Sequence, residues 1–345
     1  MRIQVPLIAA DALDRVAIAT TTSSVAAEYA RLGIMLEATN RRTLALPTTC
    51  LSHLARRPTK LETKRLGERK LASSYEGGVV VPDRALESRG GWVHWREGGH
   101  GEPLLLLNGW TASGLAWPAD WIRGLEKSFR VIRIDNRGAG WSRLAPAPFT
   151  MAQLADDAHG VLQECGVKRA TVMGLSMGGM IAQELALRHP DAVGRLFLVG
   201  TRPPTPAHIS SDLPVLLKAL RPPERGQPLD EYFTRMWAGF AAPGFAAANP
   251  EVMSELVKSI LDRTTPRAGV LAQSRAIFAW HNAGRLATIQ HPTVVVHGSR
   301  DPLIPVGNGM RLSRLIKNAS YVEVPGAGHL LPYEAPDLVA DLLQS

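Results

Sequence analysis

The sequence predicts an α/β fold in which a mostly parallel sheet is covered by helices on both faces. From about residue 86 onward, short apolar runs alternate with helical segments, and the runs are continuous, which is typical of strands buried on both sides. Helices between successive strands favour parallel connections. The 345 residues, 45% hydrophobic and 20% charged, are enough for one large domain with a smaller appendage.

The predicted strands follow one another with turn signals or helical patterns between them. The segment "KRATVMGLS", which ends at Ser176, leads into an amphipathic helix that ends at Pro190. The other predicted strands, in chain order, are "WVHW" (92–95), "EPLLLLNG" (102–109), "FRVIRIDNRG" (129–138), "VGRLFLVGT" (193–201), "HPTVVVHGS" (291–299) and "ASYVEVPGAGH" (319–329).

A long interval without any strand pattern separates two of these strands. About 90 residues of helical and proline-rich sequence lie between Thr201 and Pro292. An interval of this length is more often a lid than a loop, so we expect a helical lid over residues 203–288, inserted before the last two strands. The core then comprises residues 86–202 and 289–345.

Residues 1–85 lie outside the regular pattern. Helix-compatible runs, a Thr/Ser interruption and a segment with Pro and Arg predict an N-terminal extension that is partly helical or flexible. An extra module, a regulatory arm and an upstream stretch included by a wrongly assigned start codon all fit this pattern. The sequence does not indicate the function of the extension.

Positive charge is concentrated in this N-terminal part. The chain has a formal net charge of +8, and residues 1–80 contain 12 Lys and Arg against 7 Asp and Glu. The most basic stretch, residues 55–70, lacks interleaved aromatic residues and any helix-turn-helix or zinc spacing. We therefore expect a solvated basic segment and no nucleic-acid partner, with an adaptor role of this segment as an alternative.

No apolar run approaches the roughly 18 residues that a membrane-spanning helix needs. Cys50 and Cys165 belong to no CxxC pair, and the N-terminus lacks the pattern of a signal peptide. We expect a cytoplasmic protein without a membrane span, and the sequence does not indicate its oligomeric state.

One serine occurs in a pattern typical of an activated nucleophile. The stretch "GLSMG" places Ser176 where a strand ends and a helix begins, in a turn so sharp that side chains at the two glycines would clash. Such a serine needs a base and an orienting acid. Asp301, four residues past "VVVH", and His329, in a glycine-rich loop after the last strand, follow in the required order Ser, Asp, His. We predict that Ser176, Asp301 and His329 are catalytic.

Other polar residues near these motifs are interpreted as structural. His297 lies at a strand end and is read as a packing residue, whereas Asp135 and Arg137 are read as parts of a turn that holds a neighbouring loop. No phosphate-binding loop, dinucleotide fingerprint or H-E-x-x-H motif occurs. We therefore expect no cofactor and no metal.

Five ordered motifs make the chain, from about residue 88 to its C-terminus, resemble the α/β-hydrolase fold family: "LLLLNGW", "DNRGAGWS", "GLSMGG", "GSRDPLIP" and "GAGH". Within this family it resembles serine esterases, enol-lactonases, cofactor-free haloperoxidases and C–C bond hydrolases. The resemblance implies that Ser176 is the nucleophile, that His329 is the general base and then acid, and that Asp301 holds the imidazole tautomer. An aspartate nucleophile, which some members use, is excluded because position 176 is serine.

The resemblance also implies an oxyanion hole formed by the backbone N–H groups of Trp110 and Met177. Each such donor typically lowers the barrier by about 2.7 to 4 kcal/mol. The family usually has His-Gly where this chain has Asn108 and Gly109. Because the donor is the backbone of the next residue, we expect the hole to survive this change.

We expect a serine hydrolase that cleaves an ester, a lactone or a related carbonyl substrate through an acyl-enzyme. Trp110 and the lid residues Trp237, Phe240 and Trp280 are expected to line the substrate pocket. Their aromatic character favours a small, fairly apolar acyl substrate. The sequence identifies neither the acyl group nor the leaving group.

Three alternatives stay open at this point. C–C bond hydrolysis of a vinylogous diketone uses the same triad, although the Arg and Trp that this group places in its lid are not seen here. Perhydrolase or haloperoxidase-like activity is compatible with the same residues. A non-catalytic small-molecule receptor is an alternative of another class, because a fold does not determine a function.

Overall fold

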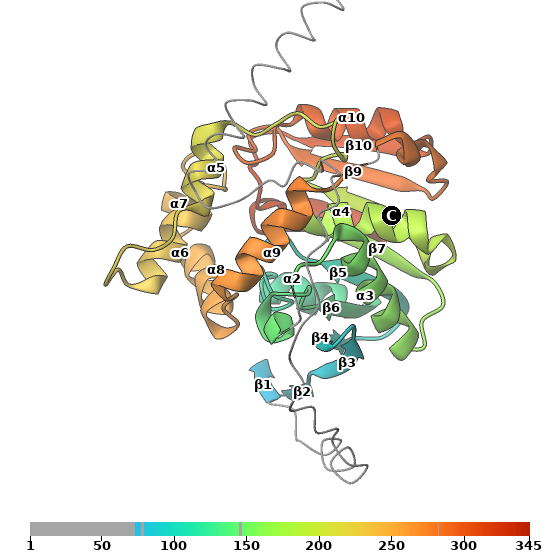
Figure 1. Ribbon diagram of the computed structural model, residues 1–345, viewed down its shortest axis with the longest axis horizontal. Coiled ribbons are helices and arrows are strands. Elements are labelled where there is room, and N and C mark those ends of the chain that lie inside the picture. Colours follow the sequence, from blue (N-terminus) through green and yellow to red (C-terminus); the bar gives the residue numbers. More distant parts are fainter. Residues whose placement is uncertain (1–72, 77–78, 145–146, 282) are drawn as a thin grey trace, which may run out of the picture. The chain divides into compact units, whose positions relative to one another are not determined.

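The computed structural model describes residues 73–76, 79–144, 147–281 and 283–345, all within the compact unit Glu68–Ser345. Its central feature is an eight-stranded sheet with the strand order β10-β9-β8-β7-β5-β6-β4-β3 (Figure 1). The predicted α/β-hydrolase sheet is thereby confirmed. The expectations for residues 1–72 lie outside the described residues.

Six neighbouring strands of the sheet run parallel, and two antiparallel strands form one edge. The parallel strands are β5 (Glu102–Leu107), β6 (Phe129–Ile134), β7 (Ala170–Leu175), β8 (Val193–Val199), β9 (Thr293–Gly298) and β10 (Ala319–Val324). The antiparallel strands are β3 (Arg84–Ser88) and β4 (Gly91–Gly98). A separate two-stranded sheet pairs β1 (Ser73–Glu76) with β2 (Val79–Pro82).

The sheet begins slightly before the boundary that the sequence pattern placed at residue 85. Arg84 already pairs with Trp95 of β4, so that boundary falls inside β3. The residues of β3 are exposed or half-buried, because this strand forms the edge of the sheet. It therefore lacks the apolar run by which the buried strands were recognised.

The leucine run of β5 explains why the central strands read as continuously apolar. Leu105 and Leu107 pack in one apolar cluster, and Leu104 and Leu106 pack in a second cluster on the opposite face. Successive side chains of a strand point to opposite faces, so a strand covered on both sides needs apolar residues throughout. The first cluster includes side chains of α3 (Met151–Glu164), α4 (Met177–Arg188) and α10 (Gly307–Leu315); the second includes those of α2 (Ala119–Leu125) and α12 (Pro336–Gln344).

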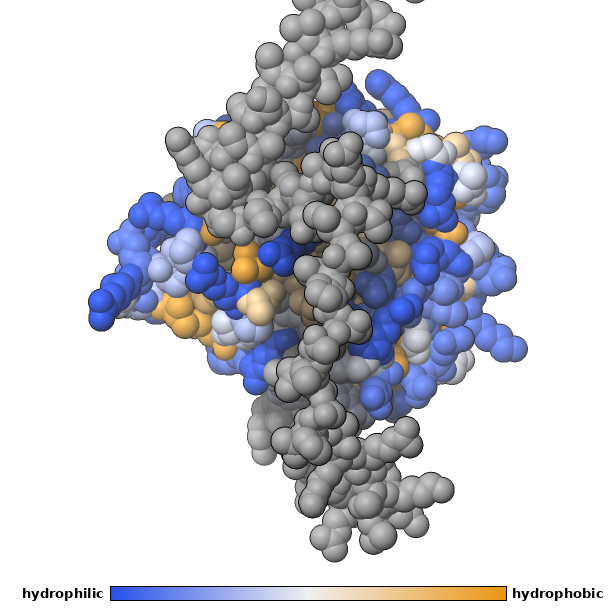
Figure 2. Space-filling model, viewed as in Figure 1, coloured by the Kyte–Doolittle hydropathy of each residue, from blue (hydrophilic) through white to orange (hydrophobic). Residues whose placement is uncertain are grey.

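The interval between β8 and β9 is helical, as predicted. It contains α5 (Leu213–Leu220), α6 (Leu229–Ala238), α7 (Phe245–Ala248), α8 (Pro250–Asp262), α9 (Arg267–Phe278) and the 3₁₀ helix η3 (Ala283–Thr288) (Figure 1). We call residues 203–288 the insert. Helices α5, α6 and α8 contribute side chains to a third apolar cluster, and Leu229 and Leu261 remain exposed. Figure 2 shows hydrophobic residues, in orange, among the hydrophilic ones on the face of the molecule that it draws.

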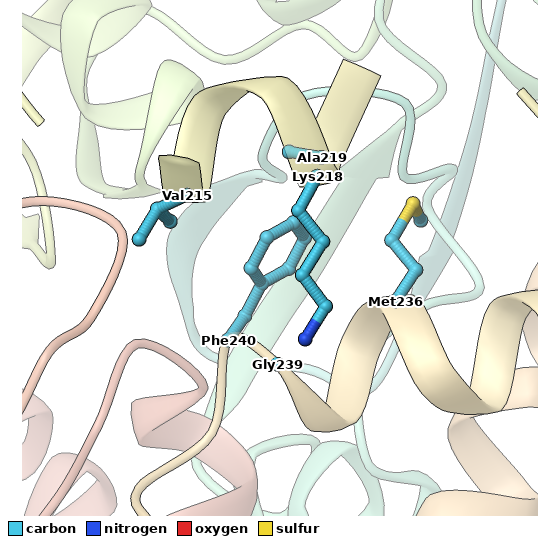
Figure 3. A pocket seen from close by; sticks show the side chains of 6 residues that line it. All are labelled: Val215, Lys218, Ala219, Met236, Gly239 and Phe240. Atoms are coloured by element: carbon cyan, nitrogen blue, oxygen red, sulfur yellow. The ribbon is translucent and has the colours of Figure 1, made fainter. Parts of the chain in front are cut away.

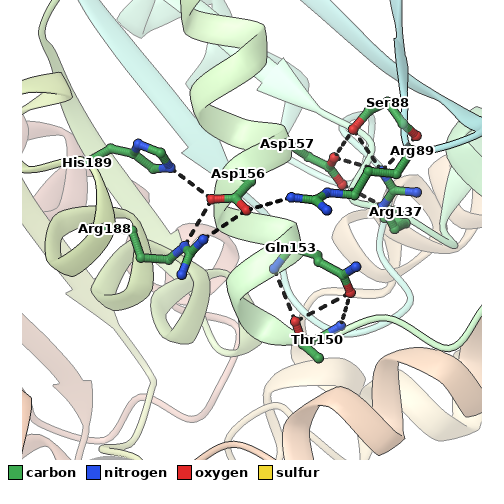
Figure 4. Close-up of polar contacts among 9 residues, drawn as sticks. All are labelled: Ser88, Arg89, Arg137, Thr150, Gln153, Asp156, Asp157, Arg188 and His189. Carbon is green, nitrogen blue, oxygen red and sulfur yellow. Dashed lines mark hydrogen bonds and ion pairs between the residues drawn. The ribbon is translucent and has the colours of Figure 1, made fainter.

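Helix α3 is fastened to its neighbours by two adjacent carboxylates (Figure 4). Asp157 accepts two hydrogen bonds of 2.7 Å from the guanidinium of Arg137, in a bidentate and buried ion pair. Asp156 binds Arg188 at the end of α4 and Arg89 in the turn after β3. These contacts agree with the interpretation of Arg137 as a structural residue. In the part of the chain that the structure describes, no helix is long and apolar enough to cross a membrane.

A buried ion-pair network ties the end of α8 to the sheet. The Arg263 guanidinium binds the carboxylates of Asp83 and Asp135 and lies 3.8 Å from the centre of the Trp141 ring. Asp135 also accepts hydrogen bonds from the backbone of Gly114 and Trp141, which agrees with its interpretation as a structural residue. The Arg263 side chain is 2% exposed, so its charge interacts with both carboxylates in a poorly screened environment.

Replacing Arg263 by methionine is expected to lower the free energy of unfolding by about 3 to 5 kcal/mol, because two buried carboxylates lose their shared cation. Urea unfolding followed by circular dichroism measures this change. The matched control is Arg221→Met, which removes an ion pair with Glu224 that is mostly exposed and is expected to leave stability unchanged. Equal stability of the R263M variant and the unmodified protein would contradict the assigned role of the network.

Candidate active site

Ser176 adopts a backbone conformation that few residues other than glycine accept. It lies between β7 and α4 with φ 58° and ψ −119°, and it is 8% exposed. Side chains at the flanking glycines are excluded: a Cβ on Gly178 would lie 1.9 Å from the Leu107 carbonyl oxygen, and one on Gly174 would lie 2.2 Å from the Gly178 oxygen. The turn therefore needs both glycines, and it holds a strained serine of the kind often found at functional sites.

His329 and Asp301 form a buried hydrogen-bonded pair. His329 Nδ1–H donates to Asp301 Oδ2 over 2.7 Å, and the other carboxylate oxygen, Oδ1, accepts from the backbone N–H groups of Leu303 and Ile304. Burial alone raises the pKa of the Asp301 carboxyl, but His329 and His297 beside it outweigh burial and lower that pKa to about 2. The carboxylate is thus ionised, held by four donors and aligned with the imidazole.

The end of β8 brings the serine and the His329–Asp301 pair together. Ser176 N–H donates to the Val199 carbonyl, and the Thr201 hydroxyl donates to the Ser176 carbonyl. Gly200 lies between Val199 and Thr201 in the chain and has φ 49°. A Cβ on Gly200 would come within 3.4 Å of His329 Nδ1 and 3.6 Å of Asp301 Oδ2. The His329–Asp301 pair therefore lies against Gly200, and the residues on either side of this glycine are hydrogen-bonded to the backbone of Ser176. Among the described residues, His329 Nε2 has no hydrogen-bond partner.

The loop after β5 lies directly against Ser176. A Cβ on Gly109 would be 3.3 Å from Ser176 Cβ, and within the described ranges the backbone N–H groups of Trp110 and Met177 donate to no protein group. Asn108, at the position where the resemblance implies histidine, donates to the carbonyls of residues 113 and 116 and accepts from Gly109 N–H. Asparagine at position 108 thus holds the loop in place, and among the described residues the N–H group of Trp110 has no hydrogen-bond acceptor.

Helix α9 of the insert braces this loop. Thr111 has φ 63°, a strained value for a β-branched residue, and its N–H donates to the side chain of Gln273 over 2.8 Å. The indole N–H of Trp110 donates to Ser274 Oγ, and the Thr265 hydroxyl donates to the Thr111 carbonyl. The strained conformation next to Ser176 is therefore maintained by contacts from the insert.

Phe240, one of the predicted pocket aromatics, lies beside the histidine. The Phe240 carbonyl accepts a hydrogen bond from His329 N–H, and the Phe240 ring packs edge-on against the imidazole with centroids 6.4 Å apart. Trp237 packs edge-on against Phe240 in turn. A cavity of about 90 Å³ adjoins Phe240 between α5 and α6, and the Lys218 side chain extends from α5 across the Phe240 ring (Figure 3). The cavity is lined by Val215, Lys218, Ala219, Met236, Gly239 and Phe240.

Trp280 lies apart from Trp237 and Phe240. Its indole N–H donates to Glu184 in the middle of α4, its ring faces Arg202, and it belongs to the core cluster rather than to the cluster of the insert. An indole that is 4% exposed and already bonded to a carboxylate is a packing residue. The expectation of a pocket residue at Trp280 therefore receives no support from its position.

Sequence reasoning missed two buried residues that contact the site. His297, read as a packing residue, has its Nε2 atom 3.3 Å from Asp301 Oδ2, and Gln273 bridges Thr111 and Arg137. For His297 the spacing i, i+4 to Asp301 across a strand end was an available signal, because both side chains follow the same strand. For Gln273 no local signal exists, since its partners lie more than 130 residues away.

Comparisons with known proteins agree with this geometry. A family model described as alpha/beta hydrolase fold matches residues 102–336. The putative carbamate hydrolase RutD of Caulobacter vibrioides is 30% identical over 251 residues, 71% of this chain and 89% of that protein. A bifunctional esterase/perhydrolase of Acinetobacter calcoaceticus is 27% identical over 251 residues, 70% of this chain and 90% of that protein. The enol-lactonase structure from Burkholderia xenovorans LB400 matches with a TM-score of 0.65 and 26% identity, over 76% of this chain and 98% of that one. The chain belongs to the alpha/beta hydrolase fold family.

The low pKa of Asp301 predicts how stability depends on acid. An unfolded aspartate titrates near pH 3.9, so below about pH 4 the unfolded chain takes up this proton before the folded protein does. Stability contributed by the ionised carboxylate is present above that pH and is lost as the pH falls toward 2. Between about pH 5 and pH 2 the protein should lose about 2 kcal/mol more than its Asp301→Asn variant, as measured by urea unfolding. Parallel pH profiles for the two proteins would contradict the shift.

Proposed function

We propose that the protein is a serine hydrolase that cleaves an ester, lactone or related carbonyl substrate through an acyl-enzyme. Ser176 Oγ attacks the carbonyl carbon while His329 Nε2 accepts the hydroxyl proton, and Asp301 stabilises the resulting imidazolium. The imidazolium then gives its proton to the departing alkoxide. Water, deprotonated by His329, attacks the acyl-enzyme and releases the acid and the free serine.

One observation carries this proposal: the backbone of a serine in a strained turn is hydrogen-bonded to Val199 and Thr201, and the glycine between them lies against a buried, hydrogen-bonded His–Asp pair. Within the described ranges, Nε2 of this histidine binds no protein group, so it is available to accept the serine proton. We assign the negative charge of the tetrahedral intermediate to the backbone N–H groups of Trp110, in the loop that lies against Ser176, and of Met177, the first residue of α4.

We further propose that the insert, residues 203–288, acts as a lid and supplies one wall of the acyl pocket. Phe240 contacts His329, and Trp110 packs against the apolar cluster of the insert. A wall of this composition selects a small, predominantly apolar acyl group.

The names of the relatives also favour chemistry at an acyl carbon. They denote a carbamate hydrolase, an esterase/perhydrolase and an enol-lactonase. Each of these activities breaks or forms a bond at a carbonyl carbon. We therefore rank hydrolysis of a carboxylic ester or lactone first, with perhydrolysis by the same acyl-enzyme as the second candidate.

Labelling with a fluorophosphonate tests the proposal directly. The reagent reacts with a serine only when a base activates it, so mass spectrometry should find the phosphonate on the peptide that contains Ser176. Turnover is then measured on a panel of p-nitrophenyl esters, lactones and vinylogous diketones, with and without hydrogen peroxide. An unlabelled Ser176 together with no turnover on the panel would favour the receptor alternative.

A further inference from the structure

A second histidine lies against the carboxylate of Asp301. His297 is at the end of β9, its side chain is fully buried, and its Nε2 atom is 2.9 Å from the Ile304 carbonyl and 3.3 Å from Asp301 Oδ2. Ile304 N–H in turn donates to Asp301 Oδ1 over 2.8 Å. His297 therefore contacts both the carboxylate and the peptide group that holds it.

The surroundings of the His297 ring determine its orientation and its donor. Nε2 faces two oxygen atoms that only accept hydrogen bonds, so Nε2 carries the proton. Nδ1 has no hydrogen-bond partner within the described residues, and it faces Gly309 of α10, where a Cβ would come within 2.8 Å. The ring is thus packed in one orientation with a single N–H directed at the 301–304 turn.

We propose that His297 is a positioning residue for the catalytic pair, acting through Asp301. This inference rests on the proposed function. The Nε2–H group orients the 301–304 turn and draws negative charge toward itself at Oδ2, the same oxygen that accepts from His329. The ionisable side chains that act on Asp301 are His329 and His297.

Loss of this N–H has two consequences. The carboxylate is oriented less firmly, so the His329 imidazole is held less well and turnover slows. More negative charge also remains on the oxygen that faces His329, which favours the protonated imidazole that cannot accept the serine proton. The acidic limb of the pH profile of kcat/KM therefore moves to higher pH.

Two substitutions of His297 with amide side chains of different length distinguish a positioning role of this residue from a packing role. In His297→Asn the amide is too short to reach the turn, whereas in His297→Gln the amide nitrogen can replace Nε2–H. For H297N we expect kcat on a p-nitrophenyl ester to fall about tenfold with little change in KM, and the midpoint of the acidic limb to rise by about half a pH unit. H297Q should stay within about threefold of the unmodified protein and keep its midpoint.

The matched control is Asn308→Ala. Asn308 is also fully buried, and it binds the backbone of Ile209 and Pro305 without contacting Asp301. This variant should lose stability and keep the pH midpoint. His297→Leu, which has no N–H and similar bulk, replaces H297N in the comparison if the asparagine variant does not fold.

The possible results distinguish this inference from the function on which it rests. Fluorophosphonate labelling of Ser176 together with unchanged kcat and an unchanged midpoint in H297N would overturn the role of His297 alone. A midpoint shift of the same size in N308A would also overturn it, because the shift would then report general loosening. Absence of labelling in the unmodified protein would overturn the proposed function itself.

Discussion

Replacing Ser176 by alanine is expected to lower kcat on any ester substrate by about 10⁴-fold or more and to abolish fluorophosphonate labelling. Alanine lacks the attacking oxygen, yet it occupies the same space and meets the same backbone strain at φ 58°. The free energy of unfolding should therefore stay within about 1 kcal/mol of its original value. Stopped-flow or steady-state release of p-nitrophenol measures the rate, and urea unfolding checks the fold.

Ser254→Ala, at an exposed position of α8, is the control for this experiment. It should retain full turnover and full labelling. Residual turnover of S176A at the level of this control would show that the reaction proceeds without Ser176, and the nucleophile assignment would then be wrong.

Replacing Asp301 by asparagine is expected to lower kcat by about 10⁴-fold, as the corresponding change does in serine-protease triads. The structure supplies the reason. Oδ1 of Asp301 accepts from the backbone N–H groups of Leu303 and Ile304, so the amide oxygen of asparagine must occupy that position. Its NH₂ group then faces His329 Nδ1 and donates to it, which places the imidazole proton on Nε2, where it blocks proton transfer from Ser176.

The pH dependence of D301N distinguishes this tautomer effect from a collapsed site. Deprotonated solvent species can replace the base at high pH, so the rate of D301N should rise with pH through the range in which the unmodified protein is on its plateau. Asp337→Asn, at an exposed position in the first turn of α12, should leave both rate and profile unchanged. A D301N rate equal to that of this control would contradict the role of Asp301.

The core of the fold was predictable because its signals are local. Central strands such as β5 and β8 contain their own apolar runs, and the alternation of Leu104 to Leu107 between two clusters shows why such runs are continuous. The predicted boundary at residue 85 fell inside β3 because an edge strand needs no apolar run. Asp83, just before it, pairs with Arg263 across 180 residues, and no window of sequence contains both partners.

The candidate site was predictable to the extent that its residues follow strand ends. Ser176, Asp301 and His329 do so, and the parallel sheet brings such positions to one edge. The direction in which a side chain of the insert points depends on how its helix packs, and the neighbouring sequence does not indicate it. Trp237 and Trp280 look alike in sequence, yet one joins the cluster around Phe240 and the other packs on α4.

The contacts of Gln273 and Ser274 with the loop at Trp110 and Thr111 affect how this enzyme scaffold could be redesigned. Under the proposed function, the insert is both the region that would be exchanged to change substrate preference and the scaffold that holds the loop at Trp110 and Thr111 in place. A chimera that receives a foreign insert would consequently lose catalytic rate along with its original selectivity. Transplanting Gln273 and Ser274 together with the new helices would preserve that coupling.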